Sequence, residues 1–268
     1  MKVIGRRIES VLMSFILFSN MAYPVCAKEL FYASFDTGLD ADHANGSKKA
    51  RIIGKAKICK DGKAHISKTD KKSQALDAGY STNEIAAVAY STKGNINPLQ
   101  GTIEMWIKTN YDWNFKDSLR FGKEQSVFFW VPFTGRGSKR IDVTCHHYTT
   151  KWPDVGHTYV GYLIFDGLAH YQHYFNVYST TGGYRGGKKW TKDNWHHIAV
   201  TWTATETRLF VDRKLKVEKK WVKPIDLMPF KDEFWLGGMT DKKGCRAMID
   251  EVRIYDEALL IKEQDEKK

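Results

Sequence analysis

The sequence has few cysteines, and their spacing matches no metal site. There are four among 268 residues, namely Cys26, Cys59, Cys145 and Cys245. Structural zinc sites need close pairs of ligands, which these widely spaced cysteines cannot provide. If Cys26 leaves with an N-terminal signal, three cysteines remain, so that at most one internal disulfide can form.

Helical periodicity and long apolar runs are also missing from the body of the chain. No segment after the N-terminus is apolar over the length needed to cross a bilayer of about 30 Å. The segment Glu257–Glu263 is the one place where we expect a short helix, followed by a frayed, charged tail. No linker or internal repeat indicates a second domain, and all-β sandwiches of this length often form one domain.

The N-terminus has the parts of a secretory signal. Basic residues lie within the first seven positions, the apolar run Val11–Phe18 follows, and Tyr23–Ala27 ends on a small residue. We therefore expect residues 1–27 to be a signal peptide and 28–268 to be the mature domain, secreted or in the periplasm or outside the cell. A retained membrane anchor is the alternative, but the apolar run is short for a span. After cleavage we expect no membrane span.

Charge is unbalanced toward basic residues. The formal net charge is +11, and removal of three basic residues and one acidic residue with the signal leaves +9. Such a surface suits polyanions, of which acidic polysaccharide and anionic cell envelope come first for an exported protein. The lysines, however, occur as dispersed pairs such as Lys48-Lys49 and Lys242-Lys243, a pattern more typical of solvated turns. We therefore expect no nucleic-acid partner.

What the body of the chain does have is alternation. Ile103, Met105 and Ile107 alternate with polar or aromatic residues, and segments 198–202 and 209–212 repeat the pattern. Alternation with a period of two predicts half-buried antiparallel strands, here with Trp106 on the face away from the core. Turn signals such as Asp166-Gly167 separate the segments and predict hairpins. Many short strands at this spacing predict a sandwich or a barrel.

Four motifs in order resemble the laminin-G-like, or concanavalin-A-like, family. They are Phe31–Asp36, Gly101–Lys108, Trp195–Trp202 and Ile249–Tyr255. The resemblance implies an all-β fold, a two-sheet antiparallel jelly-roll sandwich, here with the short C-terminal helix. One departure is Asp212-Arg213, where family members usually have Asp-Gly, because a type I′ turn strains a non-glycine residue at positive φ.

The resemblance also implies two structural features. Related jelly rolls often hold a structural calcium ion near the first and last strands, which would make Asp36 and Asp250 its ligands. The alternative is that Asp36 caps a turn and that Asp250 forms a salt bridge or binds backbone amides. Because first and last strands commonly pair in jelly rolls, the same resemblance favours a disulfide between Cys59 and Cys245.

A catalytic site is not evident. Glycoside hydrolases need two carboxyl groups about 5–9.5 Å apart, and the Glu-x-Asp-x-x-Glu run of laminarinase-type relatives is absent. Asp250 and Glu251 are adjacent, so on a regular strand they point to opposite faces. His170, Tyr171, His173 and Tyr174 supply residue types that lyases of similar fold use, but the lyase motifs are not matched as wholes. We therefore expect no catalytic residues.

Aromatic residues are concentrated in the middle third of the chain. Trp113, Trp152 and Tyr184, the last beside Arg185, lie in predicted loops, where aromatic rings can stack on the C–H faces of sugars. We predict an exported, non-catalytic module that binds carbohydrate, such as cell-envelope polysaccharide, through these four residues. The alternatives are a polysaccharide-active hydrolase or lyase, and a protein-interaction or adhesion domain.

Overall fold

The computed structural model describes most of the predicted strand segments. The described residues are 27–60, 62, 73–81, 84–110, 126–132, 140–149, 156–165, 170–179, 192, 194–220, 229–238 and 245–261. Within strands, the side chains at 126, 140–149, 156–165, 170–179 and 219 are not described. Among the described residues all regular structure is strand, and no helix there could cross a membrane.

The strands follow one another along the chain without an intervening helix in the described ranges. They are β1 (Glu29–Ala33), β2 (His43–Ala44), β3 (Arg51–Gly54), β4 (Lys57–Cys59), β5 (Ala75–Ala78), β6 (Ala86–Ser91), β7 (Gly101–Thr109), β8 (Ser126–Pro132), β9 (Arg140–Thr149), β10 (Gly156–Phe165), β11 (His170–Ser179), β12 (Trp195–Trp202), β13 (Glu206–Val211), β14 (Lys214–Lys220), β15 (Glu233–Leu236) and β16 (Ala247–Tyr255). The predicted all-β class is confirmed.

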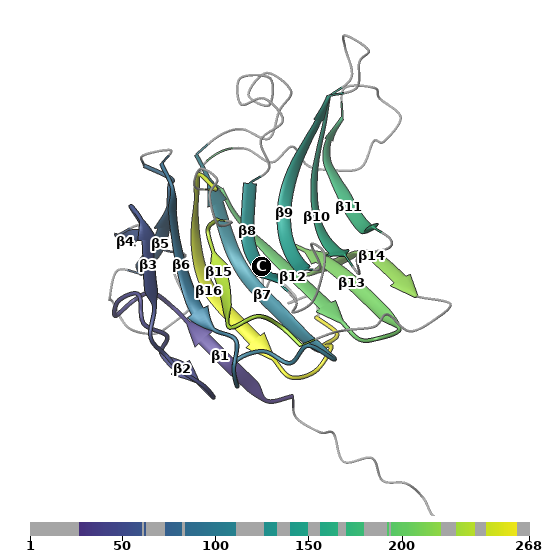
Figure 1. Cartoon of the computed structure of the whole chain (residues 1–268). Helices are drawn as coiled ribbons and strands as arrows, with labels where there is room; N and C mark the ends of the chain where they lie inside the picture. The colour runs from purple at the N-terminus through teal and green to yellow at the C-terminus, as the bar shows by residue number, and fades with distance from the viewer. Residues whose placement is uncertain are drawn as a thin grey trace, which may run out of the picture.

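Two antiparallel sheets form the sandwich (Figure 1). In the described chain one sheet has the order β14-β13-β12-β7-β16-β1-β2, with β5 pairing β16 and β4 pairing β5. The other has the order β11-β10-β9-β8-β15-β6-β3. Strands far apart in sequence are thus neighbours, as in the expected jelly roll.

The first and last strands pair with each other in the nine-stranded sheet, with β1 lying between β16 and the edge strand β2. Tyr32 lies opposite Arg253, and Ala33 opposite Val252. Just before β1, the backbone nitrogen of Lys28 donates to Oδ1 of Asp256 at 2.8 Å, and the nitrogen of Asp256 donates to the carbonyl oxygen of Lys28 at 3.1 Å. The two ends of the domain therefore hold each other in register.

An aromatic cluster joins the two sheets. The ring of Phe31 on β1 meets the rings of Tyr90 on β6 and Phe234 on β15, with centroids 4.8 and 5.2 Å away. Phe234 also contacts Phe129 on β8 at 5.6 Å. These rings are essentially solvent-free, and burying an aromatic side chain contributes roughly 1.5–3 kcal/mol.

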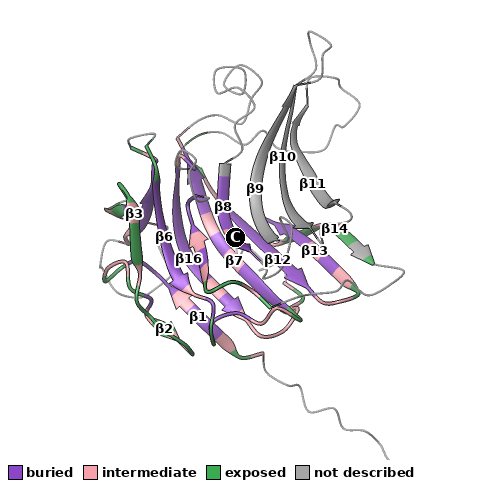
Figure 2. Cartoon of the chain, in the orientation of Figure 1, coloured by how far each residue is buried: buried purple, intermediate pink, exposed green. Residues whose placement is uncertain are grey.

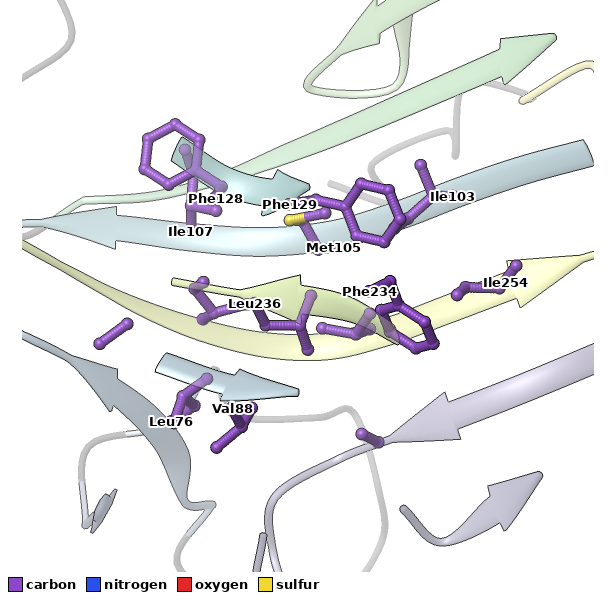
Figure 3. Packing of buried hydrophobic residues seen from close by; sticks show 14 of the residues in the cluster. Leu76, Val88, Ile103, Met105, Ile107, Phe128, Phe129, Phe234, Leu236 and Ile254 are labelled. Atoms are coloured by element: carbon purple, nitrogen blue, oxygen red, sulfur yellow. The ribbon is translucent and has the colours of Figure 1, made fainter. Parts of the chain in front are cut away.

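Predicted alternation is confirmed around this cluster. Ile103, Met105 and Ile107 of β7 are buried in the core beside Phe129, Phe234 and Leu236 of the facing sheet (Figure 3). Trp106 lies on the opposite face, with its ring 5.2 Å from that of His197. The central strands β6, β7, β12 and β16 are buried along most of their length, whereas β2 and β3 at the edges are largely exposed (Figure 2).

The expected C-terminal helix is not formed by residues 257–261, which have no regular structure; residues 262–268 lie outside the described range. Thr102 explains the difference. Its hydroxyl donates to the carbonyl oxygen of Glu257 at 2.6 Å and accepts from the backbone nitrogen of Leu259 at 2.8 Å. These contacts tie the backbone of residues 257–259 to the start of β7 in place of the hydrogen bonds of a helix.

The hairpin between β13 and β14 is a two-residue turn despite the missing glycine. Asp212 and Arg213 both have positive φ, 49° and 62°, as a type I′ turn requires. Asp212 is held from β12, because its Oδ1 accepts from the backbone nitrogen of His197 at 3.1 Å and its own nitrogen donates to the carbonyl oxygen of His197. These hydrogen bonds offset the cost of positive φ at Asp212, whereas the cost of positive φ at Arg213 remains.

We predict that Arg213→Gly stabilises the protein by about 0.5–1 kcal/mol, because glycine adopts positive φ without the Cβ clash. Lys214→Gly, one residue later in an extended strand, is the control and should destabilise it by a similar amount through the entropy of the unfolded chain. Urea unfolding measures both. Destabilisation by Arg213→Gly would contradict the assigned turn.

Candidate functional site

Two tryptophans stand side by side on the outer face of the seven-stranded sheet. Phe129 and Val131 of β8 point into the core, as do Phe234 and Leu236 of β15. Because side chains alternate along a strand, Trp130 and Trp235 face outward. They are register partners, with ring centroids 5.8 Å apart and planes at 80°.

A salt bridge lies beside this pair. Arg51 of β3 lies over the Trp235 ring, with its guanidinium carbon 5.4 Å from the centroid. The small residue Ala89 of β6 is the register partner of both Arg51 and Trp235, which leaves room for that contact. Arg51, Trp130, Glu233 and Trp235 together form what we call the Trp235 platform.

Arg51 and Glu233 are joined by a two-point contact. Arg51 Nε donates to Glu233 Oε1 at 2.9 Å, and Arg51 Nη2 donates to Glu233 Oε2. The hydrogen bond from Arg51 lowers the pKa of Glu233, with a smaller contribution from Trp235, and the same pair raises the pKa of Arg51. Both groups are therefore charged at neutral pH while staying partly open to solvent, with side-chain exposures of 53% and 37%.

The platform lies in a lateral row that crosses every strand of this sheet. The register places Asp142 of β9 opposite Trp130, Leu163 of β10 opposite Asp142, and Gln172 of β11 opposite Leu163. Neighbouring strands are about 4.8 Å apart, so a row from β3 to β11 spans roughly 29 Å. An extended ligand could thus contact the platform and several other strands together.

The outer face of the nine-stranded sheet carries a cluster of ionisable side chains whose carboxylates are hydrogen-bonded within the cluster. Glu104 Oε2 lies 3.0 Å from His197 Nε2, and the Tyr255 hydroxyl donates to Glu104 Oε1 at 3.2 Å. Burial tends to raise the pKa of Glu104, but the hydrogen bonds from His197 and Tyr255 lower it overall. We infer a framework role for these residues.

Glu251 belongs to the same cluster. Its two carboxylate oxygens accept from the Tyr32 hydroxyl at 2.8 and 3.0 Å, and Oε2 also accepts from Arg253 at 3.1 Å. The Arg253 guanidinium in turn lies 3.9 Å from the Tyr32 ring centroid. Burial is the largest cause, and the hydrogen bond to Glu251 the second largest, of a pKa of Tyr32 far above its ordinary value. The Tyr32 hydroxyl therefore stays protonated and acts as a donor.

The expectation that Asp250 and Glu251 point to opposite faces is wrong. The register shifts between Asp250 and Arg253, and Glu251 has a φ of 51°. This bulge places Asp250 opposite Trp106 while Glu251 reaches Tyr32 on the same face, because an extra residue interrupts the alternation. Both carboxyl residues are nevertheless buried, 0% and 4% exposed, which closes them to a large substrate.

The predicted calcium ligands bind backbone amides. Asp36 Oδ1 accepts from the nitrogen of Gln74 at 2.8 Å, and Asp250 Oδ1 accepts from the nitrogen of Glu251 at 2.8 Å. Asp36 is exposed whereas Asp250 is buried. Across the described ranges no three or more His, Cys, Asp or Glu residues gather as metal ligands would. Calcium binding by Asp36 and Asp250 stays a prediction.

The predicted disulfide between Cys59 and Cys245 is not formed in this structure. Cys59 Sγ donates to the carbonyl oxygen of Ala75 at 3.3 Å, and Cys245 Sγ to that of Ala78 at 3.5 Å. Strand β5 lies between the two cysteines, because it pairs β4 on one side and β16 on the other. Two strand spacings amount to about 9.6 Å, whereas bridged Cα atoms lie within about 7 Å.

The four glycan-contacting residues predicted from sequence, Trp113, Trp152, Tyr184 and Arg185, lie outside the described residues. The Trp235 platform was missed by the sequence analysis. Trp235 sits in a strand of only four residues, too short for alternation to stand out, and its partners come from distant parts of the chain. The signal that could have found it is the alternation of Phe234 and Leu236 with Glu233 and Trp235.

Residues 156–263 match the family described as the concanavalin A-like lectin/glucanases superfamily. The fold is a concanavalin A-like jelly roll. Among curated proteins, no sequence matches this concanavalin A-like chain.

Solved structures with the same fold include the fourth domain of AbnA, an extracellular family 43 arabinanase from Geobacillus stearothermophilus, in complex with arabinotriose. It is 15% identical, with a TM-score of 0.50, over 87% of this chain and 94% of that one. The binding domain of botulinum neurotoxin serotype G is 12% identical, with a TM-score of 0.58, and the chain covers 48% of it. The binding domain of Paraclostridial Mosquitocidal Protein 1 is 13% identical, with a TM-score of 0.55 and 49% covered.

These likenesses show the fold alone. The concanavalin A-like domain spans nearly the whole arabinanase domain but about half the length of each toxin binding domain.

We predict that Glu104→Gln destabilises the concanavalin A-like domain by about 1–2 kcal/mol at pH 7, because it removes a charged hydrogen-bond acceptor. The folded-state pKa of Glu104 is lowered, so its carboxylate contributes stability above the unfolded value of about 4.3. That contribution is lost as pH falls through the folded value, so the deficit of the variant should shrink toward pH 3. Urea unfolding at both pH values measures it, and an unchanged deficit would contradict the network.

Proposed function

We propose that the protein is an exported, non-catalytic module that binds carbohydrate through the outer face of its seven-stranded sheet. The observation that carries the proposal is the Trp235 platform. Outward aromatic rings and an ordered, partly exposed ion pair lie within one side-chain layer. Nothing in the core needs this arrangement, because Phe234 and Leu236 already fill the inward positions of β15.

The chemistry of the platform matches that of a sugar ring. Sugars have apolar C–H faces that stack on indole rings, and hydroxyl groups that need both donors and acceptors. Trp235 and Trp130 provide the rings, Arg51 provides N–H donors, and Glu233 provides acceptor oxygens. Because Glu233 already fixes the guanidinium, little side-chain freedom is lost when a ligand binds.

The comparisons support a binding role at the level of fold. The arabinanase domain was solved in complex with arabinotriose, and the toxin structures are binding domains. A polysaccharide-active enzyme has less support, because the carboxylates of Glu104 and Glu251 are taken up by their own network. We propose that Trp113, Trp152, Tyr184 and Arg185 extend the binding surface from the loops.

We predict that Trp235→Ala weakens binding to the best glycan of a panel of neutral and acidic polysaccharides by about tenfold or more. Loss of one stacking ring commonly removes about 1–3 kcal/mol of binding free energy. Trp106→Ala is the matched control, since Trp106 is also half-buried on an outer sheet face, but on the other sheet. Isothermal titration calorimetry on folded variants, checked by circular dichroism, measures both.

Trp113→Ala and Trp152→Ala belong in the same titrations, and reduced affinity in either one supports the loop contribution. If Trp106→Ala weakens binding as much as Trp235→Ala, or if neither variant nor the intact protein binds any glycan of the panel, the proposed function is wrong.

Export is the other part of the proposal. Cleavage after Ala27 would turn the nitrogen of Lys28 into an α-ammonium group beside the Asp256 carboxylate, with which it already makes a 2.8 Å contact. The opposite charges would then reinforce the pairing of β1 and β16, and Lys28 Nζ already binds the side chain of Asn45 at 3.0 Å. The contact with Asp256 supports the proposal that the mature chain begins at Lys28.

We predict that the protein recovered from outside the cytoplasm of its host begins at Lys28, as measured by intact-mass spectrometry. Asp256→Asn should destabilise this processed form slightly more than a form that keeps extra residues before Lys28, because only the processed form has the ammonium group. Recovery of the full-length chain from the cytoplasm alone would contradict export.

A further inference from the structure

We propose that the Trp235 platform selects neutral polysaccharides over polymers of uronic acids, although the whole chain is strongly basic. The inference rests on the proposed function, since it names the ligand class of the same site. The net charge of +11 alone would favour binding of acidic polymers. The paired charges of Arg51 and Glu233 at the platform favour neutral polymers instead.

Local charge at the platform is balanced. The positive group over Trp235 is Arg51, and Glu233 neutralises it through two contacts. Glu233 is ionised at neutral pH, because the Arg51 hydrogen bond lowers its pKa. A uronate carboxylate stacked on Trp235 would therefore meet a fixed negative charge as well as a positive one.

Distant lysines do not change this balance much. Screening by salt reduces the interaction of exposed charges beyond about 8 Å at physiological ionic strength. Beside the platform, Lys231 and Asp232 directly precede Glu233 and are both exposed, which adds one charge of each sign. Among the residues whose side chains are described, the platform and its two neighbours before β15 therefore carry equal numbers of positive and negative charges.

Neutral sugars fit the polar pair better. A guanidinium has five N–H donors and a carboxylate about four acceptor positions, so each keeps capacity after a two-point contact. Neighbouring hydroxyl groups of a sugar can donate to Glu233 and accept from Arg51 without separating them. A carboxylate ligand would have to compete with Glu233 for the same Arg51 donors, which removes the gain from its charge.

The test is a titration of the purified protein with two sets of oligosaccharides. The neutral set is from arabinan, xylan and β-glucan, and the acidic set is oligogalacturonate and oligoalginate. The salt concentration is about 0.15 M, where the Debye length is about 8 Å. We expect the intact protein to bind a neutral oligosaccharide at least about tenfold more tightly than either acidic one. Glu233→Gln should then raise affinity for the acidic oligosaccharides about two- to fivefold, because it leaves the Arg51 charge uncompensated.

Glu218→Gln is the matched control. Glu218 is also a partly exposed carboxylate paired with an arginine, since its Oε1 lies 2.9 Å from Arg208 Nε, but it sits on β14 of the other sheet. Both variants change the net charge by the same amount. A gain in acidic binding for Glu233→Gln alone supports local selection, and an equal gain for both variants overturns it.

The remaining outcomes separate the inference from the proposed function. If the intact protein prefers an acidic oligosaccharide and Trp235→Ala abolishes that binding, the platform is a glycan site but the neutral selection is wrong. If no oligosaccharide binds, or if Trp235→Ala leaves all binding unchanged, the proposed function fails and the inference fails with it.

Discussion

The constraint on which the rest of the structure depends is the packing of one aromatic cluster between two alternating sheets. Phe234 meets Phe31 from the opposite sheet and Phe129 from its own neighbour strand. Once its ring is directed inward, the pleat of β15 turns Glu233 and Trp235 outward. A slip of one residue would exchange the faces, so the burial of Phe234 determines the exposure of the Trp235 platform.

The two outer faces differ in how their charged side chains are paired and exposed. On the nine-stranded sheet, hydrogen bonds join Glu104 to His197 and Tyr255, and Glu251 to Arg253. The contact of Tyr32 with Glu251 also links the first strand to the last. Partly buried charges of this kind would be costly if any partner were removed, which is consistent with a framework. On the seven-stranded sheet, Arg51 and Glu233 are more exposed and lie beside two outward rings, which is consistent with the proposed recognition surface.

Much of the framework could be predicted from the sequence, because it depends on local periodicity and on ordered motifs. The alternation at Ile103, Met105 and Ile107 and the position of Trp106 are local properties of one strand. The helix expected at Glu257–Glu263 is not formed by residues 257–261, the part that the structure describes. Thr102, more than 150 residues earlier, forms hydrogen bonds with this backbone instead. The bulge at Asp250 likewise depends on the register with β7 and not on local sequence.

The candidate site could not be predicted for the same physical reason. Arg51, Trp130 and Trp235 come from three strands that only the jelly-roll register brings together. The disulfide inferred from family resemblance is not formed, because β5 separates Cys59 from Cys245. Contacts that depend on which strand lies between two others are not visible in composition or spacing.

The central claim is that glycan binds at the Trp235 platform, and the indole N–H resonances of the protein test it most directly. In a nitrogen-proton NMR titration with a neutral oligosaccharide that binds, the account predicts saturable shifts of the Trp235 and Trp130 signals, with the core Trp202 and the opposite-face Trp106 unchanged. Saturable binding that leaves the Trp235 signal in place would contradict it.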